Sequence, residues 1–502
     1  IMSSDWSSDV CSSDLPTLVN PRLVFGADTG LDVPEAFLQP PAEPPANRCP
    51  ELTMPMAMAV REHELDAGDE AVGTSLFGHA HHVDALPAIA AGATQADWYE
   101  AKQEINERVI RETVNAGATF SADALFDGYT RQNFLDNLLR GGLPVSVADA
   151  AGRKHVLQVY ARIHGDMERD YNSFVLEPTF YSQGNGGYRD MLQNRRHDVY
   201  MNPDVGAGVI RTFMNEIFLD GYNPHNIWGY VYSLRADCDA AALARRLTAN
   251  ADDAAVLQEL LVTAYTPGQV LTDLCRRGVS PALDRRTFLG ELLSASDATD
   301  RADTLSGYWT DHWHYNLDTI DSFLSVFPDR REDLLFTDTS YTYAQSRGFV
   351  NPRSVRLQLV DGSPQPVNFL ETPEEHNWEE RTALARVRTA YGKGDVYTTC
   401  LFAKLLALVP LKMATLDPFG VGIEFEAGRA NWNDQLHSMT DVFGSSTNET
   451  LELVRLIRFL LDAVEDIPGG EVRLTTEQVE LLAAVEGALA ELPGDDEATL
   501  FA

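Results

Sequence analysis

Cysteine and positive charge are both scarce in this chain of 502 residues. Only five cysteines occur, and none of them forms a Cys-x-x-Cys pair. Their wide spacing argues against a zinc ribbon or a disulfide framework and favours a reducing cytoplasm. Lysine and arginine together number 39 against 75 acidic residues, which gives a formal net charge of -36. A surface of this sign repels nucleic acid and anionic membranes, so neither is expected as a partner.

Long hydrophobic runs and several common motifs are also missing. The most apolar run, residues 400–412, is too short and too interrupted to cross a bilayer. No Gly-x-Ser-x-Gly elbow or Gly-x-Gly-x-x-Gly fingerprint occurs, and Gly392-Lys393-Gly394 lacks the rest of a P-loop. These absences argue against elbow-type serine hydrolases, dinucleotide-binding domains and P-loop enzymes.

The chain divides into four segments by composition. Residues 1–15 match a reading frame of a widely used sequencing adapter, and we expect them not to belong to the protein. Residues 16–96 are rich in proline, glycine and small residues, which indicates the end of a β-rich domain and a linker. Residues 97–125 are expected to form a helical linker before a main domain at residues 126–502. We expect the chain to be cut at both ends.

Apolar residues recur at helical spacing through most of the chain. The spacing predicts helices over residues 98–115, 130–140, 208–219, 253–264, 314–327, 396–409, 449–465 and 476–491. Thr475 and Gln478 form a candidate capping box for the last of these helices. Long loops rich in glycine and aromatic residues separate the helices, which is unlike βαβ alternation. The pattern predicts a mainly α toroid of helix pairs with function in the loops at one end.

The stretch from Tyr181 to Asp198 concentrates backbone freedom, aromatic surface and charge. Glycines let the chain turn sharply before Asp190, which is predicted near the start of a helix. Gln193, Arg196 and His197 follow at helical spacing and can share its face. A carboxyl against aromatic surface can keep its proton and act as a general acid. Arg189, Arg195 and Arg196 form a candidate basic island for an anion; the alternative is a capping aspartate with surface arginines.

Three further clusters have the chemistry of sugar sites, where carboxylates bind hydroxyls and aromatic faces stack on rings. They are centred on Arg169 and Asp170; on Trp309, Asp311 and His312; and on Trp432, Asn433 and Asp434. A solvated loop or an aromatic core cluster would explain the first two equally well. Hydroxyl groups at residues 445–447 could receive an anion or simply cap a helix.

Metal binding has only weak signals. The histidines at positions 79, 81 and 82, and Asp311 with His312 and His314, could supply ligands, but loops and packing explain them better. No metal is expected.

The combination of Tyr188-Arg189-Asp190-Met-Leu-Gln193 with a later Trp432-Asn433-Asp434 resembles the cellobiose phosphorylase group of inverting glycoside phosphorylases. The longer segments around these motifs look most like the branch that acts on β-1,3-glucans and oligoglucans. The similarity covers roughly residues 120–465.

The resemblance implies an (α/α)6-barrel catalytic domain after a β-sandwich and a helical linker. It also implies phosphorolysis of β-glucosidic bonds with inversion, which yields α-glucose 1-phosphate. By motif position, Asp190 protonates the leaving oxygen, Tyr188 and Arg189 contact the sugar, and Arg196 helps to hold phosphate. Gln193 and the Trp432–Asp434 motif belong to the same pocket. Inorganic phosphate is then a co-substrate, no cofactor is needed, the partner is an oligosaccharide or β-glucan, and a homodimer is left open.

Two departures from the family pattern keep alternatives open. Asn194 stands where many relatives carry aspartate, and no late histidine-containing phosphate loop is found before Ala502. An inverting β-glucoside hydrolase would instead need a base carboxylate, for which Glu424, Glu426 and Asp434 are candidates. A carbohydrate-binding fragment without activity is the third reading.

Overall fold

The computed structural model describes the chain in fifteen segments and divides it into two compact units, residues 1–113 and 114–502. The described residues are 17–49, 53–60, 62–71, 83–95, 97–161, 179–302, 313–346, 348–351, 355, 357–366, 370–371, 385–416, 422–423, 447–467 and 471–491.

The first unit consists of short elements and one long helix. In chain order they are β1 Thr17–Leu18, α2 Arg22–Phe25, α3 Glu35–Leu38, β2 Met58–Ala59, the 3-10 turn Val83–Ala85, α4 Leu86–Ala93 and most of α5 Trp98–Asn115. β1 and β2 pair in antiparallel fashion over two residues each, and they are the strands that the described part of the predicted β-rich segment contains. α5 confirms the helix predicted for residues 98–115, and none of its side chains is buried.

The second unit is mainly helical and also contains several small sheets. Its helices are α6 Ala124–Gly141, α7 Tyr188–Arg195, α8 Asp198–Met201, α9 Gly208–Glu216, α10 Ala240–Leu247, α11 Ala251–Leu260, α12 Pro267–Arg276, α13 Arg285–Ser294, α14 Trp313–Val326, α16 Leu401–Met413, α18 Thr447–Asp466 and α19 Thr476–Ala490. Single 3-10 or π turns lie at Pro203–Val205, Pro328–Arg330 and Asp333–Thr337.

Within its described residues, the strands of the second unit form two three-stranded antiparallel sheets and two strand pairs. The first sheet has the order β3 Pro144–Ala148, β4 Lys154–Ala161, β5 Thr179–Ser182; the second has the order β6 Gly186–Gly187, β7 Asn226–Leu234, β8 Ser296–Ala302. β10 Leu357–Val360 pairs with β11 Ser363–Pro366, and β9 Phe349–Val350 pairs with β12 Leu370–Glu371. The glycine-rich turn joins the two sheets, because β5 ends immediately before it and β6 lies within it.

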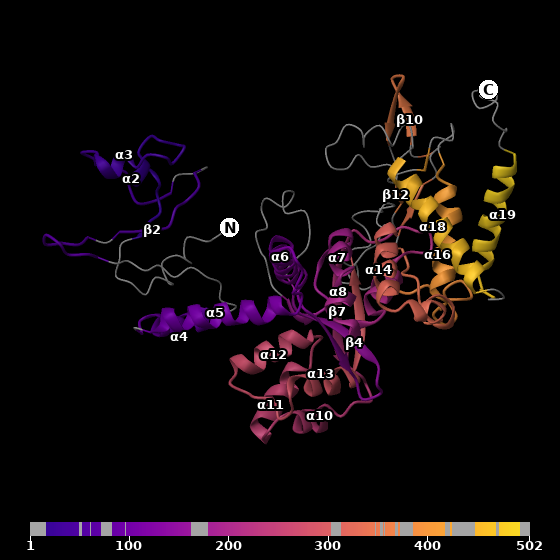
Figure 1. The fold of residues 1–502 in the computed structure, drawn as a ribbon, viewed down its shortest axis with the longest axis horizontal. Helices are drawn as coiled ribbons and strands as arrows, with labels where there is room; N and C mark the ends of the chain where they lie inside the picture. Colours follow the sequence, from indigo (N-terminus) through magenta and orange to yellow (C-terminus); the bar gives the residue numbers. More distant parts are fainter. Residues whose placement is uncertain are drawn as a thin grey trace. The chain divides into compact units, whose positions relative to one another are not determined.

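Helices α10–α13 pack on the two sheets as one group (Figure 1). Each begins after a residue whose side chain accepts a backbone N–H of the first turn: Asp239, Asn250, Thr266 and Asp284. Their apolar faces meet Val147, Leu157 and Tyr232 from the strands in one core. The sequence pattern did not predict α10, α12 or α13, nor the strands within residues 126–502.

A second core holds α14, α16 and α18 together, with α19 against α16. Trp313, Leu317 and Ile320 of α14 meet the apolar faces of α16 and α18 there. These helices confirm the ones predicted for residues 314–327, 396–409, 449–465 and 476–491, with shifted ends. The predicted capping box is present, since Thr475 and Gln478 each accept the other's backbone N–H. No helix in the described segments has both the length and the apolarity of a membrane span.

Candidate active site

The glycine-rich turn sets the direction in which α7 begins. Gly184 and Gly186 have φ of 82° and 144°, a region that residues with a Cβ rarely occupy. A Cβ at Gly184 would also lie 3.0 Å from Nη2 of Arg195. The turn therefore needs glycine both for its backbone and for the space against α7.

Tyr188 fixes the first turn of α7 from inside the core. Its hydroxyl donates to the carbonyl oxygen of Phe213 at 2.9 Å and accepts from Nδ2 of Asn316 at 3.1 Å. Its ring meets that of Phe213 edge-on, with centroids 5.3 Å apart. Burial raises the pKa of the hydroxyl well above its usual value. The side chain expected to contact a sugar is thus 0% exposed, and it orients the helix.

Asp190 lies in the first turn of α7, as predicted. Its carboxyl is about a quarter exposed, and Oδ1 is 3.3 Å from both Nε and Nη2 of Arg189. On the other side, a Cβ at Gly187 would lie 2.8 Å from Oδ2. Glycine at the N-cap therefore leaves room for the carboxyl in this rotamer, whereas a larger residue would make the carboxyl turn away.

The helical face predicted to carry Gln193, Arg196 and His197 extends only as far as the end of α7. Gln193 is half-buried, and Asn194 donates from Nδ2 to the carbonyl oxygen of Asp190 at 2.6 Å. An aspartate at position 194 could not donate this bond. α7 ends at Arg195, so the single helical face predicted through Arg196 and His197 is interrupted. Burial, followed by the charge of Arg196, lowers the pKa of His197.

The two arginines of the basic island lie in different surroundings. Arg196 is partly exposed and donates from Nη1 to Oδ2 of Asp318 on α14 at 3.1 Å. Arg195 is only 3% exposed, and its Nη2 lies 3.4 Å from the carbonyl oxygen of Gln183. Burial lowers the pKa of Arg195, and the nearby charge of Asp198 partly offsets that effect. Of the two, only Arg196 can present its guanidinium to an outside ligand.

The first turns of three helices meet at this end of the unit. Asn316 in the first turn of α14 holds Tyr188 of α7. Trp313 donates from Nε1 to Oε2 of Glu449 in the first turn of α18 at 3.2 Å, and Nδ1 of His314 is 3.6 Å from Oε1 of Glu449. Helix starts of α7, α14 and α18 are therefore linked by buried polar side chains. The segments that lead into them include the predicted aromatic and amide motifs.

Several predicted residues lie outside the described part of the chain. They are Arg169, Asp170, Trp309, Asp311, His312, Trp432, Asn433 and Asp434, together with Glu424, Glu426 and the histidines at 79, 81 and 82. Among the residues that are described, no group of three His, Cys, Asp or Glu side chains is placed to hold a metal ion.

A buried acidic pair beside α7 was not predicted from the sequence. Glu216 at the end of α9 and Asp300 on β8 are 1% and 7% exposed, and the charge of Asp300 acts on Glu216. Arg386 binds Asp300 and donates from Nη1 to the carbonyl oxygen of Asn215 at 2.5 Å. Burial and then the charge of Asp300 raise the pKa of Glu216 well above its usual value. Only the order of apolar residues around Glu216 could have signalled its burial.

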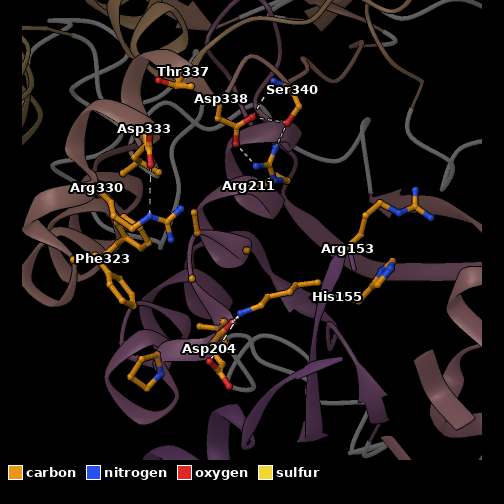
Figure 2. A pocket seen from close by; sticks show the side chains of 18 residues that line it. Arg153, His155, Asp204, Arg211, Phe323, Arg330, Asp333, Thr337, Asp338 and Ser340 are labelled. Atoms are coloured by element: carbon orange, nitrogen blue, oxygen red, sulfur yellow. Dashed lines mark hydrogen bonds and ion pairs between the residues drawn. The ribbon is translucent and has the colours of Figure 1, made fainter. Parts of the chain in front are cut away.

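A large cleft lies elsewhere on the second unit, at the C-terminal end of α14 (Figure 2). Its volume is about 1080 Å³. Its ionisable lining residues are Arg153, Lys154, His155, Arg211, Arg330, Asp204, Asp333 and Asp338. Ten residues of helix separate its Phe323 from Trp313, roughly 15 Å along α14.

The cations of this cleft are already paired with carboxylates. Arg211 binds Asp338 and Ser340 in Figure 2, and Nζ of Lys154 lies 3.9 Å from Oδ1 of Asp204. None of the residues predicted for the site lines the cleft. It is a separate polar surface, and the predicted acid is not part of it.

Comparison of the chain with models of known protein families finds no match, and comparison with curated proteins finds none. The geometry around Asp190 therefore carries the functional argument.

Proposed function

We propose that this chain catalyses inverting phosphorolysis of β-glucosidic bonds in gluco-oligosaccharides or β-glucan. The observation that carries the proposal is the placement of Asp190. It stands in the first turn of α7, directly after the glycine-rich turn, partly exposed and beside the half-buried Arg189. The motif by which the sequence resembles inverting glycoside phosphorylases assigns the acid to this position.

The arrangement of helix starts supports an (α/α)6 barrel as the finer description of the second unit. In such a barrel, function lies in the loops at one end of the helices. Tyr188, Asn316 and Glu449 join the first turns of α7, α14 and α18 at one end. The strands β3–β8 would then be insertions between barrel helices.

The reaction requires two things of the protein, a general acid and a site that binds phosphate. Asp190 gives its proton to the glycosidic oxygen as the bond to the anomeric carbon breaks. A phosphate oxygen attacks that carbon from the opposite face, which inverts its configuration and yields α-glucose 1-phosphate. Phosphate then returns a proton to Asp190. Arg196, whose guanidinium is partly exposed and also pairs with Asp318, is the residue we assign to phosphate binding.

The four described cysteines are free thiols, which fits the reducing cytoplasm that we propose as the location of the enzyme.

The test is sugar 1-phosphate formation from cello- and laminari-oligosaccharides by the wild type and by Asp190→Asn. We expect turnover to need inorganic phosphate and to fall by at least about 10²–10⁴-fold in the variant, the usual contribution of a general acid. Asp204→Asn is the matched control, because Asp204 is an exposed aspartate of the cleft. Its turnover should stay near that of the wild type.

Two outcomes would overturn the proposal. Turnover by Asp190→Asn close to the wild-type rate would remove Asp190 from the role of acid. Reducing sugar released equally with and without phosphate would identify an inverting hydrolase instead.

A further inference from the structure

A small cavity lies beneath the glycine-rich turn, between α7, α9, β4 and β7. Its volume is about 30 Å³. One water needs at least about 10–15 Å³ of such volume, so the cavity has room for one or two. Its polar lining comes from Gln158, Gln183, Arg195, Thr212 and Glu216.

Three of these side chains bring polar atoms that find no hydrogen-bond partner within the described segments. They are Oε1 of Gln158, Nη1 of Arg195 and both carboxyl oxygens of Glu216. All three residues are at most 3% exposed, so bulk solvent cannot satisfy these atoms. Buried polar atoms without partners are rare in folded proteins, and ordered water usually accounts for them.

The unsatisfied atoms cannot easily turn to other partners, because the same side chains are held elsewhere. Gln158 donates from Nε2 to Oδ2 of Asp198 at 2.6 Å. Nη2 of Arg195 lies 3.4 Å from the carbonyl oxygen of Gln183. Gln183 in turn accepts from the backbone N–H of Tyr230 at 3.0 Å. These bonds fix the direction in which the remaining polar atoms face.

The mixture of donors and acceptors selects the ligand. Arg195 offers an N–H group, Gln158 offers an amide oxygen, and the carboxyl of Glu216 can accept and, when it carries a proton, also donate. A cation would be repelled by the guanidinium of Arg195, and an anion would be repelled by the side-chain oxygens of Gln158 and Glu216. Water can accept from one side and donate to the other.

We infer that this cavity holds one or two ordered water molecules that join Arg195 to Gln158 and Glu216, and that Arg195 thereby positions the turn leading to Asp190. The second half of the inference rests on the proposed function. Arg195 is then a positioning residue and has no contact with phosphate. Its links to the carbonyl of Gln183 and to the water keep the turn against α7.

Crystal structures of the wild type, Arg195→Met and Arg196→Met test the water site without any assay. We expect density within about 2.7–3.2 Å of Nη1 of Arg195 and of an oxygen of Gln158 or Glu216 in the wild type and in Arg196→Met. Arg195→Met should lose that density, and its thermal midpoint should fall further than that of Arg196→Met. Glu216→Gln, which keeps a side-chain oxygen, should retain the water if Arg195→Met fails to fold.

A cavity without density in the wild type, a direct contact between Arg195 and Glu216, or a peak with anomalous signal from an ion would overturn the inference. Equal thermal midpoints of Arg195→Met and Arg196→Met would also overturn the inference.

Kinetics then separate positioning from phosphate binding. Arg195→Lys, which keeps a donor in the cavity, should recover much of the kcat lost in Arg195→Met, with the KM for phosphate near its wild-type value in both. Arg196→Met should instead raise the KM for phosphate. A manyfold rise in that KM in Arg195→Lys would show that Arg195 contacts phosphate. If the wild type has no phosphorolytic activity, the proposed function fails, and the density and thermal midpoints still decide the water site.

Discussion

Asp198 shows how a single buried carboxyl links α8, the short helix that follows α7, to the first sheet. It is 2% exposed and accepts from Nε2 of Gln158 on β4 at 2.6 Å. Burial raises its pKa from 3.8 to about 7, although the charge of Arg195 and the bond from Gln158 oppose the change. The folded protein therefore keeps a proton on Asp198 at pH values where the unfolded chain has released it.

This difference predicts a pH dependence of stability. The folded-state pKa of an acid is raised here, so the free energy of unfolding should fall as pH rises from about 4 to about 7 and then level off. The slope from this one group is at most about 1.4 kcal/mol per pH unit. Asp198→Asn removes the ionisation but keeps a side-chain oxygen that can accept from Gln158.

Urea unfolding of the wild type and Asp198→Asn, at pH 5 and at pH 8, measures this effect. We expect the variant to gain stability relative to the wild type at the higher pH, by on the order of 1 kcal/mol or more. Asp252→Asn at an exposed position of α11 is the control, and its difference from the wild type should not change with pH. A constant difference for Asp198→Asn would mean that Asp198 is ionised at both values.

At the scale of elements, helices α12 and α13 approach the first sheet through glycine. A Cβ at Gly268 of α12 would lie 1.7 Å from the carbonyl oxygen of Phe180, and one at Gly290 of α13 would lie 2.4 Å from that of Ala148. Backbone atoms cannot move aside as the end of a flexible side chain can. These two glycines therefore set how closely the helices pack on the strands.

Alanine substitution of two helical glycines should have opposite effects. Gly290→Ala forces α13 away from β3 and should lower the free energy of unfolding by about 1–3 kcal/mol. Gly487→Ala on α19 meets nothing within 4 Å and should raise it by about 0.5–1 kcal/mol, because alanine favours helix. Denaturant unfolding of both variants checks the pair. Similar stabilities for the two would contradict the close packing of α13.

Sequence periodicity predicted the long amphipathic helices and missed the short or strongly packed elements. α10, α12 and α13 have eight to ten residues each, and their N-caps are Asp239, Thr266 and Asp284, which are equally common in loops. β4 and β7 were missed because their sequences do not alternate strictly: Leu157 and the polar Gln158 are both buried in β4, and Gly229 interrupts β7. Their pairing depends on strands that are distant in sequence.

At the scale of the whole molecule, acidic residues outnumber basic ones so strongly that single arginines bind several carboxylates. Arg455 on α18 binds Glu452 of its own helix at 3.1 Å and both Asp318 and Asp321 of α14. Asp318 also accepts from Arg196 beside α7. One charged network thus connects three helices that were predicted separately from the sequence.

The sequence predicted the candidate site only where the site is built from residues that are neighbours in sequence. The sequence predicted Asp190 near a helix start, and Asp190 lies in the first turn of α7. The burial of Tyr188 against Phe213, and the proximity of Glu216 to Asp300, depend on residues more than twenty positions away. Such contacts leave no periodic signal, so the sequence could not separate inward-facing from outward-facing members of one motif.

The net charge of -36 leads to a final prediction about salt. Repulsion among excess carboxylates destabilises the compact state, and ions screen it over about 10 Å at 0.1 M. We expect the thermal midpoint to rise by several degrees between low ionic strength and about 0.15 M sodium chloride. Arg455→Met should show a larger rise than the wild type, because it leaves three carboxylates without their shared cation. Arg276→Met, which removes a surface pair with one carboxylate, is the control. A midpoint that falls with salt would show that attractive pairs outweigh the repulsion across this acidic surface.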